Sequence, residues 1–192
     1  MVTRFVAFDC ETTGTDPERD AIVTIGAVSI QNAEIVLEDA FDAMIKMDHA
    51  TSSIVVHGIT PAEAAEGVSP AEAVDAFLNY VGQSVLVGHH VGFDKRIVDR
   101  TAQKHLQRRL SNPALDTMRM TLALQEAGRL EAGEAGRFDL DGLCERFGIV
   151  PHDRHTASGD AFITAQIFLQ LFRFIQKAGL RWQDLLEKEE NP

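Results

Sequence analysis

Acidic side chains follow the first apolar segment of the sequence at a spacing that lets them act together. Asp9 and Glu11 come directly after Phe5–Phe8 and are separated only by Cys10. Because side chains alternate along a strand, both carboxylates are expected on one face of it and Cys10 on the other. Crowded carboxylates repel each other unless a cation or a proton intervenes, and such oxygen ligands suit Mg²⁺ or Mn²⁺. Taken alone, the pair is explained equally well by caps or turn acceptors for the next loop.

A second candidate acid is Asp94, which follows the short apolar segment Val85–Val87 and a glycine-containing connection. Its position repeats that of the first motif, because it again lies where a buried strand is expected to pass into a helix. An N-cap of that helix is the alternative role for this residue.

The third candidate pair is His155 and Asp160, at the start of the C-terminal helix. Five residues of α-helix correspond to about 500° of rotation, so two fully helical residues at this spacing would point about 140° apart. His155 must therefore lie in the preceding loop to meet Asp160. From there its imidazole can accept a proton near neutral pH while Asp160 holds a metal ion. An exposed loop histidine without a chemical role is the alternative.

The hydrophobic pattern predicts the elements that position these residues. Apolar and β-branched segments separated by short turns predict an antiparallel meander followed by one more buried strand. The predicted strands cover residues 4–9, 22–30, 35–45 and 85–87. Apolar residues at helical spacing predict a helix after Ser69, helices over 93–107 and 140–147, and another helix after a turn at 112–116. The last long helix begins near Asp160 and reaches Lys177. The result is an α/β fold with a mixed sheet covered by helices on both faces.

Composition limits the classes of protein that remain. A chain of 192 residues with 45% hydrophobic and 24% charged residues is typical of one globular domain. The longest apolar stretch, Ala21–Ile30, is too short for a membrane span, which needs about 20 residues. Two cysteines, Cys10 and Cys144, exclude a disulfide framework and a four-thiolate zinc site. With no secretory leader in the first residues, we expect a cytoplasmic protein.

The charge distribution is uneven. The net charge of −11 argues against broad coating of nucleic acid. Residues 95–109 nevertheless contain six basic side chains and one acid, a local charge of +5. On a helix, Arg96, Arg100 and Lys104 would share one face that could track a phosphate backbone. An ordinary solvated face is the alternative.

Together, the three motifs resemble those of the DEDDh exonuclease family, which includes the proofreading epsilon subunit of bacterial DNA polymerase III, ribonuclease T and oligoribonuclease. The matching segments are Phe8-Asp9-Cys10-Glu11-Thr12-Thr13-Gly14, Gly88-His89-His90-Val91-Gly92-Phe93-Asp94 and His155-Thr156-Ala157-Ser158-Gly159-Asp160. Weaker similarities lie at 22–28, 56–60 and 115–117, so the resemblance covers most of residues 4–175. One departure is His90, where the family usually has Asn.

The resemblance implies a ribonuclease H-like exonuclease fold with a central five-stranded mixed sheet flanked by helices. It implies 3′-to-5′ hydrolysis of single-stranded DNA or RNA ends, DNA being favoured, to nucleoside 5′-monophosphates. Two divalent cations, Mg²⁺ or Mn²⁺, would be bound by the four acids, with His155 as general base. The implied metal ligands are Asp9, Glu11, Asp94 and Asp160.

The resemblance also implies the surroundings of the reacting bond. Residues at the 3′-terminal nucleotide would be Thr12, Gly14, His57 and Phe93. We expect an exonuclease domain over residues 1–180 and a short acidic C-terminal helix or tail over 181–192. A polymerase or another replication or repair protein is the candidate partner, and no membrane association is expected.

Three other functions fit parts of the pattern. An exoribonuclease that trims short RNA would use the same residues. A phosphatase of the haloacid dehalogenase kind also has an acid pair after its first strand, but its second acid is Asp, and the His-x-Ala-x-x-Asp segment has no place in its mechanism. A non-catalytic interaction module could keep the fold, although all five reactive residues are present.

Overall fold

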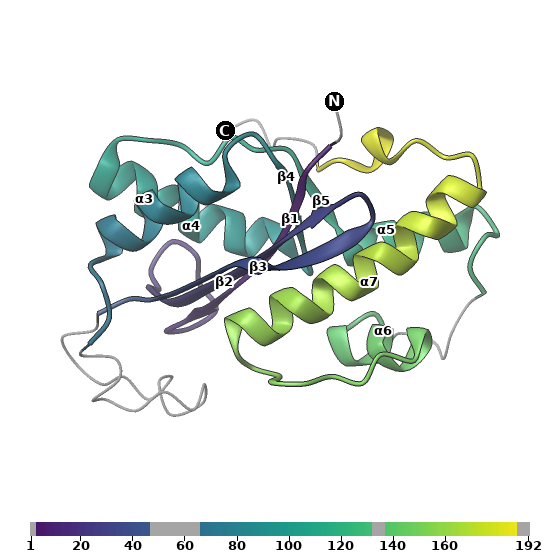
Figure 1. Cartoon of the computed structure of the whole chain (residues 1–192), viewed down its shortest axis with the longest axis horizontal. Coiled ribbons are helices and arrows are strands. Elements are labelled where there is room, and N and C mark those ends of the chain that lie inside the picture. The colour runs from purple at the N-terminus through teal and green to yellow at the C-terminus, as the bar shows by residue number, and fades with distance from the viewer. Residues whose placement is uncertain (1–2, 47–65, 132–136, 188–192) are drawn as a thin grey trace.

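The computed structural model describes residues 3–46, 66–131 and 137–187. Five strands form one mixed sheet in the order β3-β2-β1-β4-β5, with β1 at its centre (Figure 1). The strands are β1 (Phe5–Thr12), β2 (Ile22–Gln31), β3 (Glu34–Met44), β4 (Val85–Gly88) and β5 (Ala114–Asp116). The first three pair antiparallel, whereas β4 and β5 run parallel to β1. The predicted five-stranded mixed sheet is therefore confirmed.

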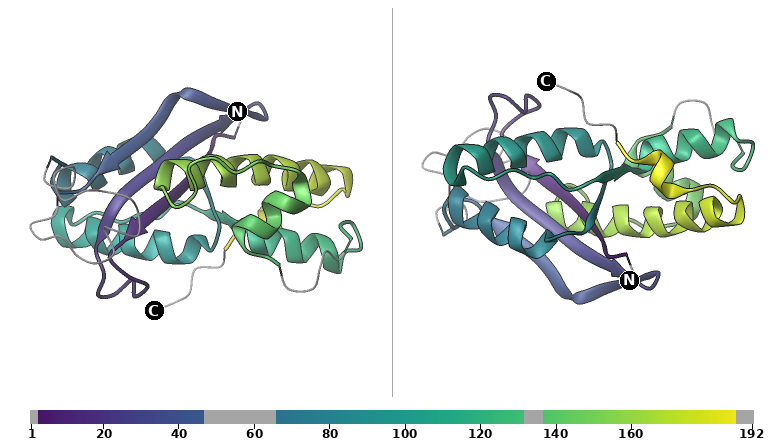
Figure 2. Two further views of the ribbon diagram at one scale, coloured as in Figure 1. Left: turned by 90° about the horizontal axis from the view of Figure 1, so that it is seen from below. Right: turned by 90° about the horizontal axis from the view of Figure 1, so that it is seen from above.

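Helices cover both faces of this sheet (Figures 1 and 2). They are α3 (Pro70–Val81), α4 (Val91–Leu106), α5 (Thr117–Glu126), α6 (Leu140–Phe147), α7 (Ala157–Lys177) and the single-turn 3₁₀ helix η1 (Trp182–Leu185). Val6 and Phe8 of β1 belong to the hydrophobic core shared with α3 and α4. Phe5 and Ala7 belong to the second core, shared with α5, α6 and α7. Strand alternation thus directs the odd-numbered residues of β1 toward α7.

Several predicted boundaries differ from the observed ones, among them the end of β1 at Thr12 in place of Asp9, and two differences bear on the site. Ala114–Asp116 forms β5, in parallel register with β4, where the sequence pattern predicts only a turn. A three-residue strand is too short to show a period of two, so only its pairing with β4 reveals it. Helix α4 begins at Val91, two residues earlier than predicted, because His90 precedes it as the N-cap. Asp94 consequently lies inside the first turn of α4 and is not its cap.

The described part of the C-terminal segment packs on the domain. After η1, Leu186 forms a bridge with Leu115, and the backbone N–H of Glu187 donates to the Ala114 carbonyl at 2.8 Å. Among the described residues of this segment, the helical part is one 3₁₀ turn, and residues 188–192 lie outside the described residues. None of the described helices combines the length and hydropathy that a membrane span requires.

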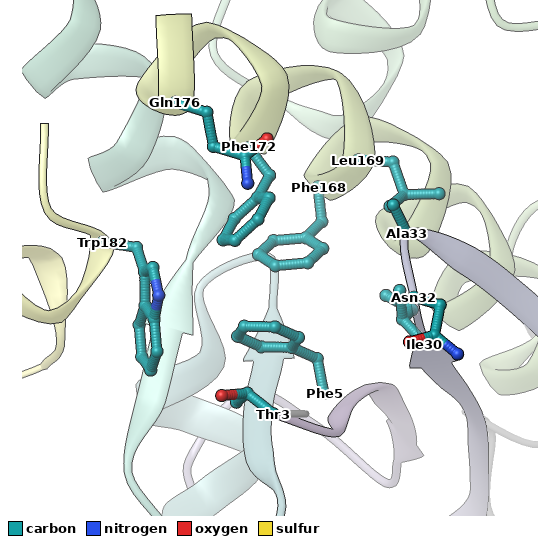
Figure 3. Close-up of a pocket in the computed structure, with 10 residues that line it drawn as sticks. All are labelled: Thr3, Phe5, Ile30, Asn32, Ala33, Phe168, Leu169, Phe172, Gln176 and Trp182. Carbon is teal, nitrogen blue, oxygen red and sulfur yellow. The ribbon is translucent and has the colours of Figure 1, made fainter. Parts of the chain in front are cut away.

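An apolar pocket of about 310 Å³ lies beside this segment (Figure 3). It is lined by the aromatic rings of Phe5, Phe168, Phe172 and Trp182, and the Phe5 and Trp182 ring centroids are 5.3 Å apart. Phe5 begins β1, whereas the candidate acids lie near the end of that strand. The pocket is therefore separate from the candidate site.

The first turn of α7 makes an unusually close contact with the sheet. Gly26 of β2 is the register partner of Asp9 on β1. A Cβ atom at Gly26 would lie 2.2 Å from the backbone nitrogen of Ser158. Glycine inside a strand is typical of such close backbone approaches. The missing side chain therefore allows the start of α7 to lie directly over Asp9.

We expect Gly26→Ala to lower the free energy of unfolding by about 2–3 kcal/mol, because the added methyl group meets backbone atoms that cannot rotate away. Chemical denaturation measures this change. Gly92→Ala is the matched control, since a Cβ there meets the Glu187 carboxylate at an ordinary 3.6 Å inside a helix. That variant is expected to be neutral or more stable by up to about 1 kcal/mol. Equal stability of both variants would contradict the close contact between α7 and β2.

Candidate active site

Three of the predicted acids meet where β1 and α7 cross. One carboxylate oxygen from each of Asp9, Glu11 and Asp160 lies within 4.8 Å of the other two. Asp9 and Glu11 share the face of β1 that packs on α7, as alternation predicts, and Asp160 lies in the first turn of α7. Glu11 and Asp160 are buried, while Asp9 is partly exposed. An all-oxygen donor set of this kind fits a hard divalent cation.

The fourth acid, Asp94, reaches the same end of the sheet from the opposite face. It is 5% exposed and lies in the first turn of α4, beside Cys10. The backbone N–H of Cys10 donates a hydrogen bond to its carboxylate. Asp94 is not one of the three acids within 4.8 Å, but its charge still acts on Asp9. The structure thus groups three predicted ligands and places the fourth beside them.

Burial and like charge make these acids hard to ionise. Burial is the main cause that raises the pKa of Asp94 to about 8, and the Glu11 charge adds to it. Burial also raises the pKa of Asp9 well above its usual range, followed by the charges of Asp94, Asp160 and Glu11. The Cys10 thiol has a raised pKa for the same reasons, so it remains a protonated core side chain. The acids require protons or positive charge nearby.

One basic side chain supplies such charge. Nη1 of Arg154 donates to both carboxylate oxygens of Asp160, and its Nε donates to Oδ1 of Asp141 on α6 at 2.7 Å. The Arg154 charge partly offsets the rise in the pKa of Asp9. Sequence reasoning treats Arg154 only as part of a loop. A lone basic residue between His152 and the acid Asp160 is the signal that could have identified it.

His155 lies in the loop before α7, as the helix geometry requires, and is exposed. Its backbone takes the left-handed conformation with φ of 63°, and Asp153 does so with φ of 53°. The hydroxyl of Thr156 donates to the Asp153 carbonyl at 2.7 Å and accepts from the Gly159 backbone N–H at 3.1 Å. A Cβ atom at Gly159 would lie 2.1 Å from that carbonyl oxygen. Gly159 therefore lets the loop fold back over the first turn of α7.

The residues expected around the terminal nucleotide are only partly described. Thr12 is buried, and its hydroxyl donates to the Gly14 carbonyl at 2.6 Å in the turn after β1. Phe93 is half-buried in the first turn of α4. His57 lies outside the described residues. Thr12, Gly14 and Phe93 thus follow or neighbour the acids Glu11 and Asp94 in sequence.

The substitution of His90 for the usual Asn has a backbone consequence. His90 is the N-cap of α4, with φ of 60° and ψ of 39°, and makes no side-chain cap hydrogen bond. Asn adopts this left-handed conformation more readily than His does, which explains why Asn suits the position. The carboxylate of Asp116 accepts from the Val91 backbone N–H at 3.0 Å and so supports the start of the helix. The turn that carries Asp94 is thus fixed without Asn.

Comparisons with known proteins find relatives among DNA polymerase III proteins. The chain is 32% identical over 186 residues to a PolC-type DNA polymerase III from Thermotoga maritima, covering 96% of this chain and 13% of that protein. It is 36% identical over 181 residues to a DNA polymerase III subunit epsilon-like protein from Rhodobacter capsulatus, covering 92% and 25% of the two chains. The chain thus spans a quarter or less of the length of these two relatives.

Structural similarity extends to solved exonucleases. Escherichia coli Exonuclease I in complex with a dT13 oligonucleotide matches with a TM-score of 0.74 and 20% identity, over 91% of this chain and 42% of that one. This similarity shows a shared fold. The exonuclease family model of the ribonuclease T type matches residues 6–168. Because that match spans most of the chain, the resemblance of the three motifs is confirmed and the protein belongs to the ribonuclease T exonuclease family.

Proposed function

We propose that this chain is a metal-dependent 3′-5′ exonuclease that releases nucleoside 5′-monophosphates from single-stranded ends, with DNA as the favoured substrate. The observation that carries the proposal is the cluster of Asp9, Glu11 and Asp160 at the crossing of β1 and α7 in a chain of the exonuclease family. Trimming of short RNA remains the second candidate, because the same residues would serve it. The family match removes the haloacid dehalogenase phosphatase, and the intact reactive residues disfavour a non-catalytic module.

Two divalent cations, Mg²⁺ or Mn²⁺, fit the acids. Asp9, Glu11 and Asp160 would hold one cation between them, and Asp94, beside Asp9, would help to hold the second. Bound in this way, the pair of cations would activate the attacking water and stabilise the leaving 3′-oxygen of an in-line displacement. The raised pKa of Asp9 and of Asp94 supports this role, because cations offset the same repulsion that the protons relieve.

The remaining site residues would accept the proton of the attacking water and bind the nucleic acid strand. His155, exposed in the loop before α7, would accept the proton of the attacking water at an imidazole nitrogen. The turn at Thr12 and Gly14, together with His57 and Phe93, would position the terminal nucleotide. On α4, Arg96 and Lys104 are exposed and suit the phosphate backbone. Arg100 donates instead to the Asp20 backbone carbonyl, so it secures α4 to the loop after β1.

The names of the relatives support a further part of the proposal. Both are described as DNA polymerase III proteins, one of the PolC type and one epsilon-like. We therefore propose a polymerase or another replication or repair protein as the partner. Within this chain, residues 1–180 would form the exonuclease domain and 181–192 a short tail. The cytoplasmic location stays a prediction.

The proposed activity predicts metal-dependent shortening of 3′-labelled single-stranded oligonucleotides with release of labelled 5′-monophosphates. DNA and RNA of equal sequence distinguish the two substrate candidates. Asp9→Ala is expected to abolish turnover, while its melting temperature without metal holds or rises because one repelling charge is removed. A folded Asp9→Ala protein with near-normal activity would remove Asp9 from the site. Release of inorganic phosphate from small phosphate esters would contradict exonuclease activity altogether.

The general-base role predicts that His155→Ala lowers the turnover rate by about 10²–10⁴-fold, the usual effect of a positioned base. Metal binding, measured by calorimetry, should change little because the carboxylates provide it. His152→Ala is the matched control, since His152 is exposed in the same loop. Equal losses for the two variants, or a collapse of metal binding in His155→Ala, would refute this role.

The raised pKa of Asp94 predicts an unusual pH dependence without metal. Between its ordinary pKa of 3.8 and about 8, the folded chain keeps a proton that the unfolded chain releases, so stability falls as pH rises. Asp94→Asn removes this effect. Its melting temperature should exceed that of the wild type near pH 8, by about 2–4 °C per kcal/mol, and the advantage should shrink toward pH 5. Asp184→Asn, at an exposed residue, is the control. A constant difference across this range would contradict the raised pKa.

A further inference from the structure

Arg154 bridges two acids on different helices. Its Nη1 donates to both oxygens of Asp160 on α7, and its Nε donates to Asp141 on α6. The side chain is 20% exposed, that of Asp160 is 10% exposed, and that of Asp141 is 54% exposed. A guanidinium whose N–H groups face two carboxylates forms strong, directional, charge-assisted hydrogen bonds. The bridge is therefore a specific contact of the site.

We propose that Arg154 is a positioning residue whose guanidinium holds Asp160 until a divalent cation takes one of the same oxygens. This inference rests on the proposed function, because it assumes that Asp160 is a metal ligand. Nη1 of Arg154 approaches both oxygens of Asp160, and the cation would need one of them together with oxygens of Asp9 and Glu11. A cation on that oxygen and the Arg154 guanidinium would compete for the same carboxylate and repel each other, so metal binding would weaken or displace the contact with Arg154.

The bond to Asp141 gives the displaced side chain a place to remain. It uses Nε, whereas the contact with Asp160 uses Nη1, so one bond can break while the other persists. Asp141 lies in the first turn of α6, outside the acidic cluster. The hydrogen bond to Arg154 is the main cause that lowers the pKa of Asp141, which keeps this anchor ionised. Arg154 then stays at the edge of the site as a positive charge for the phosphate backbone.

Exchange of the Arg154 guanidinium for a cation at Asp160 would also affect the loop that holds His155, the next residue in the chain. The 153–156 loop holds two non-glycine residues in the left-handed conformation, Asp153 and His155. Arg154 lies between them and ties the loop to both α6 and α7. Release of Asp160 would remove the contact of Arg154 with α7, while its bond to α6 and the bond between Thr156 and Gly159 would stay. Metal loading would therefore change one of the contacts that hold the loop with the proposed base.

Mn²⁺ titration of the full chain without nucleic acid tests the competition, with calorimetry as the readout. Arg154→Gln removes the competing charge, so we expect Mn²⁺ to bind about tenfold more tightly than to the wild type. A purely structural role would leave the affinity unchanged or weaken it. Arg137→Gln is the matched control, because Arg137 pairs with Glu145 on the outer part of α6, and both side chains are largely exposed. That variant should bind Mn²⁺ like the wild type.

Arg154→Lys gives a second test that keeps a positive charge. Lys presents one ammonium group in place of a fork, so it cannot bond Asp141 and Asp160 as Arg does. We expect an Mn²⁺ affinity between those of the wild type and Arg154→Gln. Should Arg154→Gln fail to fold, tighter binding by Arg154→Lys would still support the proposal.

The outcomes separate this inference from the proposed function. Wild-type binding that is lost in Asp160→Asn but unchanged or weaker in both Arg154 variants would overturn the inference alone. No Mn²⁺ binding by the wild type, or binding unaffected by Asp160→Asn, would overturn both. Tighter binding in the Arg154 variants together with normal binding by Arg137→Gln would support the competition.

Discussion

Mutual repulsion among crowded, largely buried carboxylates is the constraint on which this site depends. Asp9, Glu11 and Asp160 have oxygens within 4.8 Å of one another, and Asp94 adds its charge from the neighbouring helix. Carboxyl groups this close together in a poorly solvated region cannot all remain ionised without compensating protons or positive charge. Protons, the Arg154 guanidinium and divalent cations are three ways to provide this compensation. If the proposed cations bind here, the protonation of the acids, the conformation of Arg154 and the metal content are consequently linked.

The fold creates this crowding at one end of the central strand β1, where acidic residues lie on both of its faces. Odd-numbered residues of β1 point toward α7, and Gly26 allows the first turn of α7 to lie against the sheet beside Asp9. Cys10 points to the other face, where Asp94 enters from α4. To bring the four acids together, β1 therefore needs close packing against α7 on one face and a short β4–α4 connection on the other. Neither helix alone would bring four acids together.

Local rules predict much of this arrangement from sequence, and the limits of those rules explain the rest. Strand alternation places Asp9 and Glu11 on one face, and helix rotation places His155 in the loop before Asp160. Neither rule reveals β5, because three residues show no period and their identity as a strand depends on β4. The separation of Asp94 from the other acids was not predictable either. It depends on which face of the sheet α4 covers, which is a property of the tertiary fold.

Rigid and strained parts of the site have different roles. The acids lie on a central strand and in the first turns of helices, where backbone hydrogen bonds hold them. His155 lies in a loop with two left-handed non-glycine residues, a conformation that costs about 1–3 kcal/mol for each. The contacts of Thr156 and Arg154 offset that cost, but Arg154 uses Asp160, an acid that the proposed metal would also need. Under the proposed function, the part of the site that would respond to metal is thus the loop with the proposed base, while the carboxylates would keep their places.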